Sequence, residues 1–477
     1  MVFSSVIFTF LFLPIVLGLY FACRNDRWRN GVLLVSSLFF YWYGEHTFFF
    51  IMLASILGNY LFALLIDRSA GTGRRKFWLT LDVIANLSVF FVFKYLNFTL
   101  KMANDLFHAN VLVTNIALPI GISFFTFQAM SYVFDVYRGD AEVQKNPLRL
   151  ALYVAFFPQL IAGPIVRYKT IEEQIRTHRT ITAERFGYGV ERFMIGYCKK
   201  VIIANNLSNC VSYPFALLDF AGADHPVLYY WIGAVAYSLQ ILFDFSGYSD
   251  MAIGMGEMFG FHFDENFNYP YMAKSVTDFW RRWHISLSSW FRDYVYIPLG
   301  GSRVSVPRHI FNMLVVWGLT GIWHGANYTF WLWGLIYWFF LVIEKYLIRP
   351  EQRPRGVQIA WRVVTLLIVM FEWVLFNAVG LKQGIHYWMA MLGFYNHSLG
   401  FTNPDVIRLW REWGPYILMG VLFSTPAAKV IRARCNKSAG LRAFCDVAFP
   451  VGLFLAFVWA VSFLVMGAHN PFIYFNF

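Results

Sequence analysis

Two stretches decide the fold and the candidate chemistry of this sequence: FWRRWHISLSSWFRDY (residues 279–294) and GIWHGANYTFWLW (residues 321–333). Each places one histidine, His284 or His324, among tryptophans, in a part of the chain that is apolar enough to enter a bilayer. An ionisable side chain at membrane depth is costly, so its presence indicates function by default. Residues 279–333 are therefore the candidate reaction site.

The composition is that of a polytopic membrane protein. Of the 477 residues, 58% are hydrophobic, 20% are aromatic and only 14% are charged, whereas soluble domains average about 25% charged residues. A soluble core of this size needs far more polar surface to cover it. Apolar runs of bilayer-spanning length alternate with short basic loops, so we predict an all-α protein with about ten to twelve spans and additional re-entrant segments.

The net charge and the reactive side chains exclude several classes of protein. The charge of +12 comes from basic residues clustered between apolar runs, as the positive-inside rule expects, and no basic stripe indicates nucleic-acid binding. The five cysteines include no CxxC pair, so neither a disulfide framework nor a metal site is predicted. The sequence has no GxSxG, P-loop or HExxH motif. A base-catalysed group transfer and a transport protein with polar residues along its path both remain open.

Two apolar stretches contain helix-breaking residues. Pro119 and Gly121 interrupt residues 111–134, and Pro158 interrupts residues 150–166. Irregular backbone at membrane depth is tolerated only where protein buries it or it lines a cavity. For the first stretch a broken segment and a kinked helix are equally open; the second is predicted to be re-entrant.

Later segments carry polar groups into apolar surroundings. Asp244 and Asp250 interrupt an apolar helix; they either line a polar interior or satisfy neighbouring helix ends or arginines. Residues 277–296 are predicted to form an amphipathic, partly buried helix that enters the membrane at an angle. Residues 311–343, which contain His324, are predicted to form two helices or one broken helix.

His324 and His284 are the candidate catalytic residues. Burial holds an imidazole neutral, which suits a general base, and Gly325 is predicted to let a substrate approach His324 closely. A packing role for His324 is equally open at this point. His284 is predicted to orient or polarise the reacting group or to bind the donor. The surrounding residues that we predict to contact donor or substrate are Trp280, Arg281, Arg282, Asp293, Trp323 and Asn327.

Each of these surrounding residues also has a simpler interpretation. Arg281 and Arg282 suit the phosphates of an anionic donor such as coenzyme A, but they also suit snorkelling to the membrane surface. Asp293 either orients a histidine or pairs with Arg292 or Arg303.

Six strings together resemble one known family, the membrane-bound O-acyltransferases, in the type of the membrane subunit of bacterial alginate and cellulose O-acetylation systems. They occur in family order along nearly the whole chain: FFPQLIAGPIVRY (156–168), DFSGYSDMAIG (244–254), NFNYPY (266–271), FWRRWHISLSSWFRDYVYIPLGG (279–301), WHGANYTF (323–330) and NPFIYF (470–475).

The resemblance implies a fold and a reaction. It implies one integral membrane domain over residues 1–477, with a family core at about 119–344, built as a ring of about eleven tilted helices with re-entrant segments around a tunnel. His324 corresponds to the catalytic base of the family, and His284 to its more variable second polar position. The implied activity transfers acetyl groups from cytoplasmic acetyl-CoA across the bacterial inner membrane.

The resemblance also implies the partners. The acetyl group ends on an exported polysaccharide of the alginate or cellulose type, through a periplasmic acetyltransferase partner. Membrane lipid surrounds the chain, and no metal or tightly bound cofactor is expected. Two alternatives stay open: D-alanyl transfer to teichoic acid on a related fold, and a non-catalytic transporter of acetyl groups or lipid-linked sugars.

Overall fold

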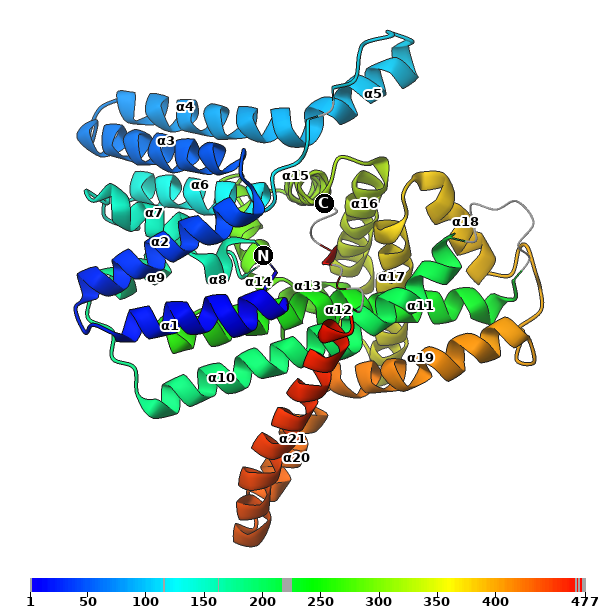
Figure 1. Cartoon of the computed structure of the whole chain (residues 1–477). Coiled ribbons are helices and arrows are strands. Elements are labelled where there is room, and N and C mark those ends of the chain that lie inside the picture. Colours follow the sequence, from blue (N-terminus) through cyan, green and yellow to red (C-terminus); the bar gives the residue numbers. More distant parts are fainter. Residues whose placement is uncertain are drawn as a thin grey trace. The chain divides into compact units, whose positions relative to one another are not determined.

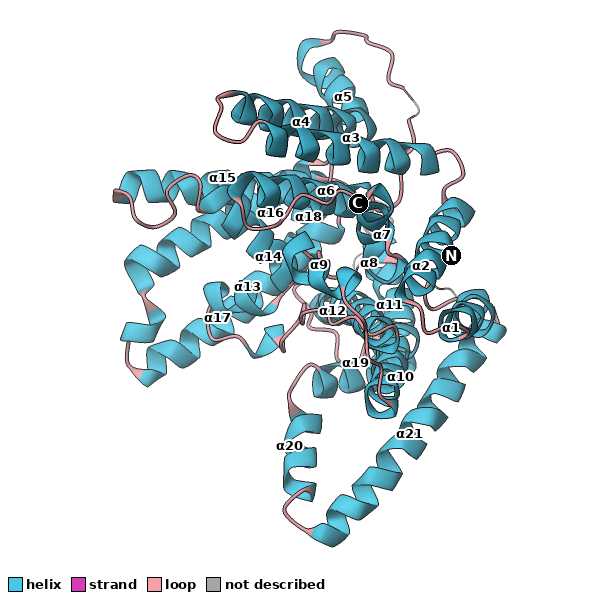
Figure 2. Ribbon diagram, turned by 90° about the vertical axis from the view of Figure 1, so that its left-hand side faces the viewer, coloured by secondary structure: helices cyan, strands magenta, loops and turns pink. Residues whose placement is uncertain are grey.

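The computed structural model describes residues 2–114, 116–161, 163–216, 225–467, 470, 472 and 473, and within these ranges all regular structure is helical (Figures 1 and 2). Ala162 and residues 471, 474 and 475 of the quoted strings lie outside the described residues. The predicted all-α class is confirmed.

Several helices are long and apolar enough to cross a membrane. There are six among the described residues, and seven if the pair Pro404–Phe423 and Ala427–Cys435, bent by 62°, is one span. The six are Phe49–Arg68, Arg74–Phe107, Val227–Met258, Tyr328–Gln352, Arg355–Asn377 and Ala439–Val465. The membrane character is therefore confirmed, whereas the larger predicted number of spans stays a prediction.

The described chain forms two compact units, the first of which comprises residues 1–193 and 249–264. Asn59 and Asn86 exchange amide hydrogen bonds of 3.1 and 3.2 Å between two of its helices. Paired amides of this kind satisfy polar groups where no water is present. The helices within this unit are α1 (Leu13–Phe21), α2 (Asp26–Gly44), α3 (Phe49–Arg68), α4 (Arg74–Phe90), α5 (Leu96–Phe107), α6 (Ile122–Arg138), α7 (Pro147–Ala155), α8 (Phe157–Leu160) and α9 (Tyr168–Arg176).

The first unit contains the first of the two predicted backbone breaks, the one at Pro119 and Gly121. Helix α6 begins at Ile122, after Gly121 with φ +77°, and the described residues before it, 111–114 and 116–119, are not helical. A Cβ atom at Gly121 would lie 3.1 Å from the Leu160 carbonyl oxygen, so the backbone approaches closely there. The broken-segment interpretation is confirmed and the kinked-helix alternative is wrong.

The pairing of Asp250 settles one of the open alternatives. Helices α10 (Ala183–Cys198) and α12 (Val227–Met258) each belong partly to both units. Within the first unit, Asp250 Oδ1 accepts hydrogen bonds from Arg192 Nε at 3.0 Å and Nη2 at 2.7 Å. Gly254 makes this crossing close, since a Cβ atom there would lie 2.5 Å from the Gly189 carbonyl oxygen. Asp250 therefore pairs with a basic group on a neighbouring helix.

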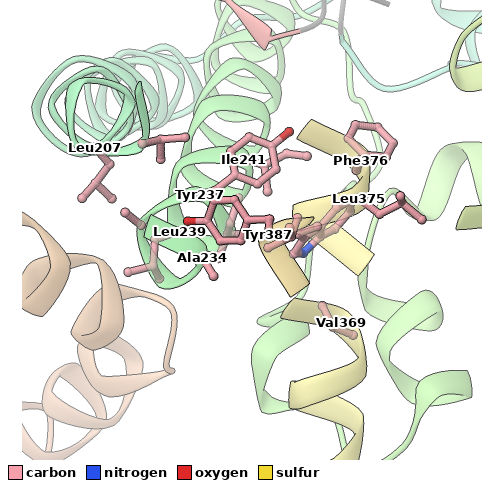
Figure 3. Packing of buried hydrophobic residues seen from close by; sticks show 14 of the residues in the cluster. Leu207, Ala234, Tyr237, Leu239, Ile241, Val369, Leu375, Phe376 and Tyr387 are labelled. Carbon is pink, nitrogen blue, oxygen red and sulfur yellow. The ribbon is translucent and has the colours of Figure 1, made fainter. Parts of the chain in front are cut away.

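The second unit comprises residues 194–248 and 265–477, and its core joins α12, α17 and α18. Tyr237 of α12, Tyr387 of α18, and Leu375 and Phe376 of α17 belong to one cluster of buried hydrophobic side chains (Figure 3). The helices within this unit are α11 (Asn205–Ala216), α13 (Val276–Arg282), α14 (Ile285–Phe291), α15 (Val306–His324), α16 (Tyr328–Ile343), α17 (Arg355–Asn377), α18 (Leu381–Met391), α19 (Pro404–Phe423), α20 (Ala427–Cys435) and α21 (Ala439–Val465).

Asp244, the second acid of α12, forms a buried ion pair in this unit. Its Oδ1 lies 2.6 Å from Lys200 Nζ, and both side chains are at most 2% exposed. Lys200 also donates to Asn205 Oδ1 at 2.7 Å, and the backbone N–H of Ile473 donates to Asp244 Oδ2 at 2.9 Å. Asn205 in turn donates to Asn470 Oδ1 at 3.0 Å. Residues near the end of the chain thus complete the hydrogen bonding of a buried charge pair.

Candidate active site

His284 interrupts the helix that was predicted over residues 277–296. Helix α13 ends at Arg282 and α14 begins at Ile285, with His284 between them in the left-handed conformation, φ 45° and ψ 55°. The prediction of one continuous helix is wrong here. A left-handed conformation at a non-glycine residue costs free energy and persists only where the surrounding structure enforces it.

Backbone pairing with residues 266–268 holds this break. The N–H of Asn268 donates to the Arg282 carbonyl at 2.9 Å, and the N–H of Ile285 donates to the Asn266 carbonyl at 3.0 Å. These two bonds flank His284 on both sides, so the loop fixes the direction in which the imidazole leaves the backbone.

Asn266 also sets the orientation of the His284 ring. His284 Nδ1 lies 3.2 Å from Asn266 Oδ1, which accepts further hydrogen bonds from Ser286 N at 3.1 Å and Ser286 Oγ at 2.9 Å. An oxygen that accepts from these groups makes Nδ1 the donor, so in the neutral ring the lone pair lies on Nε2. The ring is 1% exposed and stands edge-on to Phe245.

A buried carboxylate fixes the start of α13. Glu344 Oε2 accepts from Val276 N at 2.7 Å and Oε1 accepts from Thr277 N at 2.9 Å. Oε2 also accepts from Trp361 Nε1 at 2.8 Å. The first backbone N–H groups of a helix have no partner within the helix, and the positive end of the helix dipole favours an anion there. Glu344 thus ties the helix that leads to His284 to the end of α16 and the start of α17.

We expect Glu344→Gln to lower the activity of this site by about tenfold to a hundredfold, because small misplacements at a reaction site have effects of this size. The amide replaces one acceptor oxygen with a donor, which leaves a backbone N–H of α13 without its partner. Initial rates, normalised to the amount of inserted protein, measure the effect. Glu351→Gln, an exposed neighbour, is the control and should transfer normally; a normal rate in Glu344→Gln would contradict the positioning role.

His324 is the last residue of α15 and lies in a box of aromatic rings. Its ring centroid is 5.0 Å from Trp323, 5.0 Å from Trp333 and 5.1 Å from Phe376, each at an angle near perpendicular. The side chain is 4% exposed. Of the two alternatives predicted for residues 311–343, two helices is confirmed, because α15 and α16 are separate helices that lie side by side (Figures 1 and 2).

Gly325 serves packing and does not open space for a substrate. A Cβ atom at this position would lie 2.2 and 2.4 Å from two ring carbons of Phe330. The prediction that Gly325 admits a substrate is therefore wrong, because the space belongs to Phe330. Phe330 in turn contacts Phe376, with ring centroids 4.9 Å apart, so the glycine supports one wall of the aromatic box.

We expect Gly325→Ala to destabilise the protein by about 1–3 kcal/mol, since overpacking a filled site has effects of this size. Thermal unfolding in detergent measures this loss. Combining it with Phe330→Leu should recover part of the stability. Gly356→Ala, where nothing lies within 4 Å of the added Cβ, is the control; equal stability of both alanine variants would contradict the packing role.

Trp323 brings the two histidines into one site. Its ring centroid lies 6.2 Å from His284 and 5.0 Å from His324. Both histidines and this tryptophan belong to the second unit. The predicted grouping of His284, His324 and Trp323 is therefore present in the structure.

The other predicted site residues separate into distinct environments. Trp280 is buried against Trp333, 5.5 Å between ring centroids. Arg281 is exposed and forms no hydrogen bond or ion pair with any described residue, whereas Arg282 Nε donates to Asp278 at 2.8 Å.

Two further predicted residues take part in local structure. Asp293 pairs with Arg292 at 2.7 Å, which is one of the partners predicted for it. Asn327 caps α16, accepting from Thr329 N at 3.2 Å, and donates to the Val379 carbonyl at 2.7 Å.

Three residues of the site carried no predicted role. Asn266 belongs to the quoted string NFNYPY, but no pattern linked it to His284. Glu344 and Phe376 reach the site only through the packing of α16 and α17, which sequence spacing does not encode. Among the described residues, no group of three or more His, Cys, Asp or Glu side chains is arranged to hold a metal ion.

Comparison with known proteins identifies the family. Residues 125–382 match the model of the membrane-bound O-acyltransferase family. The chain belongs to this family. The resemblance drawn from the six strings is confirmed, and the protein is an O-acyltransferase embedded in a membrane.

Curated relatives of this O-acyltransferase include enzymes with different named acceptors. It is 39% identical to a probable alginate O-acetylase AlgI of Azotobacter vinelandii over 100% of both chains. It is 32% identical to a peptidoglycan O-acetyltransferase of Helicobacter pylori over 90% of this chain and 87% of the relative. A teichoic acid D-alanyltransferase of Bacillus subtilis is 28% identical over 55% of this chain and 68% of the relative.

Proposed function

We propose that this O-acyltransferase passes acetyl groups from acetyl-CoA on the cytoplasmic side across the bacterial inner membrane, for O-acetylation of an exported polysaccharide of the alginate or cellulose type. A periplasmic acetyltransferase partner completes the transfer. The full-length similarity to a probable alginate O-acetylase supports the acetyl group and the polymer. The observation that carries the proposal is the grouping of His284 and His324 around Trp323 in a buried aromatic pocket.

His324 acts as the general base. Its imidazole takes the proton of the acceptor hydroxyl as that oxygen attacks the thioester carbonyl. The carbon–sulfur bond then breaks, and the imidazolium returns the proton to the departing thiolate. A positioned base of this kind contributes about 10²–10⁴-fold to a rate. The aromatic box around His324 excludes water, which limits hydrolysis of the thioester.

His284 assists from the other side of Trp323. Because Asn266 occupies Nδ1, the Nε2 atom faces the reaction space as an acceptor for a substrate hydroxyl. This orientation helps to place the acceptor oxygen and does not require a second proton transfer.

The donor is bound at the α13 end of the site. Arg281 is the better candidate for the donor phosphates, since it is exposed and has no described partner, whereas Arg282 is held by Asp278. Trp280 and Trp323 form aromatic walls. Asn327 and Asp293 take part indirectly, through the α16 cap and the pair with Arg292.

The proposed architecture is that of one integral membrane domain over residues 1–477, with a family core at about 119–344. About eleven tilted helices with re-entrant segments surround a tunnel that gives the donor and acceptor access from opposite faces. The six to seven apolar spans and the broken segment before α6 support this arrangement. No metal or tightly bound cofactor has a role in the proposed steps.

The proposal is tested with purified protein in liposomes, supplied with acetyl-CoA that carries a label in its acetyl group. We expect release of free coenzyme A that depends on an added acceptor, and labelled acetyl groups on that acceptor. Acceptor labelling only when D-alanyl carrier protein replaces acetyl-CoA would instead support D-alanyl transfer, the activity of the more distant relatives. No consumption of the thioester under any acceptor condition would instead support a transport role.

A further inference from the structure

Glu372 is a buried acid that the proposed chemistry does not use. It lies near the C-terminal end of α17, is 2% exposed, and forms no hydrogen bond or ion pair with any described residue. Leaving a buried carboxyl without a partner costs several kcal/mol. An ionisable residue within a membrane span is for the same reason a functional hypothesis by default.

The carboxyl belongs to a group of polar atoms that share this condition. Trp373, the residue after Glu372, stacks against Trp333 of α16 with ring centroids 6.4 Å apart, and Trp333 contacts Tyr337 at 5.0 Å. The Tyr337 hydroxyl and the indole N–H groups of Trp280 and Trp333 are buried without a hydrogen-bond partner among the described residues. The three rings contact one another, with centroids 4.9 to 5.5 Å apart. Folded proteins leave few such groups unpaired, and a ligand is one of the reasons for which they do.

This group of unpaired polar atoms lies next to the aromatic box of His324. Phe376, one helical turn after Glu372, contacts the His324 ring at 5.1 Å, and Trp333, one turn before Tyr337, contacts it at 5.0 Å. Along α13, Trp280 is followed by Arg281, the exposed arginine proposed for the donor phosphates. The unpaired group thus contacts His324 through Trp333, and Arg281 follows it along α13.

An acyl-coenzyme A has three kinds of chemical group along its length that could match Arg281, the unpaired group and His324 in turn. Phosphates lie at one end, the thioester at the other, and the secondary amides of the pantetheine arm lie between them. A secondary amide offers one N–H donor and one carbonyl acceptor. The cluster offers the complement, an acceptor carboxyl on Glu372 and a donor hydroxyl on Tyr337.

We propose that Glu372 and Tyr337 form a donor-binding site that takes a pantetheine amide, with the amide N–H donating to the Glu372 carboxyl and its carbonyl accepting from the Tyr337 hydroxyl. The indole N–H groups of Trp280 and Trp333 are further donors to the same arm. This inference rests on the proposed use of acetyl-CoA and adds the residues that select a donor by its arm. The amide anchors the arm so that the thioester carbon reaches His324.

Two thioesters that differ in the arm test this site: acetyl-CoA, which carries the amides, and ethyl thioacetate, which carries none. We expect Glu372→Leu to raise the KM for acetyl-CoA by about tenfold, the worth of one to two lost hydrogen bonds. The rate with ethyl thioacetate should stay that of the unmodified protein. Tyr337→Phe should shift the KM in the same direction, and Glu372→Gln, which keeps an acceptor oxygen and the side-chain shape, should restore most of the affinity.

Stability separates this role from a structural one. Replacing an unpaired buried carboxyl by an apolar side chain is neutral or stabilising, so Glu372→Leu should unfold at an equal or higher temperature. Thr365→Val is the matched control, since Thr365 lies seven residues earlier on α17, is fully buried, and has a hydroxyl without a described partner. It should change neither KM.

Three results would overturn the site. An unchanged KM for acetyl-CoA in Glu372→Leu is the first, and an equal loss with both thioesters is the second. The third applies if Glu372→Leu does not fold: the decision then rests on Tyr337→Phe, and an unchanged KM in that variant overturns the site. If the unmodified protein transfers acetyl groups from ethyl thioacetate but never from acetyl-CoA, the proposed donor fails, whatever the variants do.

Discussion

Replacing His324 with alanine is expected to lower acetyl transfer by about 10²–10⁴-fold, because a positioned general base contributes a factor of that size. The loss should appear in kcat more than in KM, since the imidazole acts on the proton that moves in the transition state. Initial rates with labelled acetyl-CoA measure both quantities. His324→Gln, which keeps a hydrogen-bonding side chain but cannot take the proton, should be nearly as inactive.

The control for this result is a histidine outside the aromatic box. His397 is exposed, and His397→Ala should transfer acetyl groups at the normal rate. The amount of inserted protein and its unfolding temperature in His324→Ala show whether the fold survives. A folded His324→Ala variant that keeps a rate within a few-fold of normal would remove His324 from the mechanism.

The second large effect is expected at the buried pair of Lys200 and Asp244. Asp244→Ala should destabilise the protein by about 3–5 kcal/mol, because it leaves the Lys200 ammonium buried without its counter-ion. The backbone N–H of Ile473 also loses its acceptor in this variant. Thermal unfolding in detergent and the yield of inserted protein measure the loss.

A double variant without either charge distinguishes the effect of an unpaired charge on stability from the effect of altered packing. In Lys200→Met with Asp244→Asn, neither charge remains, and the asparagine oxygen still accepts from Ile473. We expect this double variant to be far more stable than Asp244→Ala, since removing both charges avoids an unpaired buried ion. Equal instability of the two variants would show that the ion pair itself is required. Normal stability of Asp244→Ala would show that the pair contributes little.

Apolar runs and helix breakers predict the gross fold of this chain from its sequence. The all-α class, the break before Ile122 and the separate helices on either side of residues 325–327 follow from hydrophobic length and from Pro or Gly positions. Sequence also leaves two choices for Asp250, and the structure decides between them through Arg192, which lies far away in the chain. Local patterns indicate that a buried acid needs a partner but do not say which one.

The backbone at His284 is not predictable in the same way. Residues 277–296 have the amphipathic pattern of one helix, yet the chain leaves the helix at Trp283 and His284 because Asn266 and Asn268 bind the backbone there. These contacts come from a segment outside the helix, so the hydrophobic periodicity of residues 277–296 does not predict them. A tertiary contact overrides the local preference, as is common at functional sites.

Some residues of the candidate site are predictable from the sequence, and others are placed there only by tertiary packing. Histidines among tryptophans in an apolar stretch mark His284 and His324 as candidates, and the structure brings both against Trp323. Glu344 and Glu372 act from α16 and α17, where the sequence gives only isolated acids in apolar runs. Gly325 was expected to give access to a substrate, but its missing side chain makes room for Phe330.

Acetyl transfer in sealed vesicles of one orientation tests the role of His324 most directly. Acetyl-labelled coenzyme A is supplied on the cytoplasmic face, with the polysaccharide and the partner acetyltransferase on the opposite face. We expect labelled acetyl groups on the polymer with the unmodified protein, and about 10²–10⁴-fold less label with an equal amount of inserted His324→Ala. Equal labelling by the two proteins would contradict a His324-catalysed transfer.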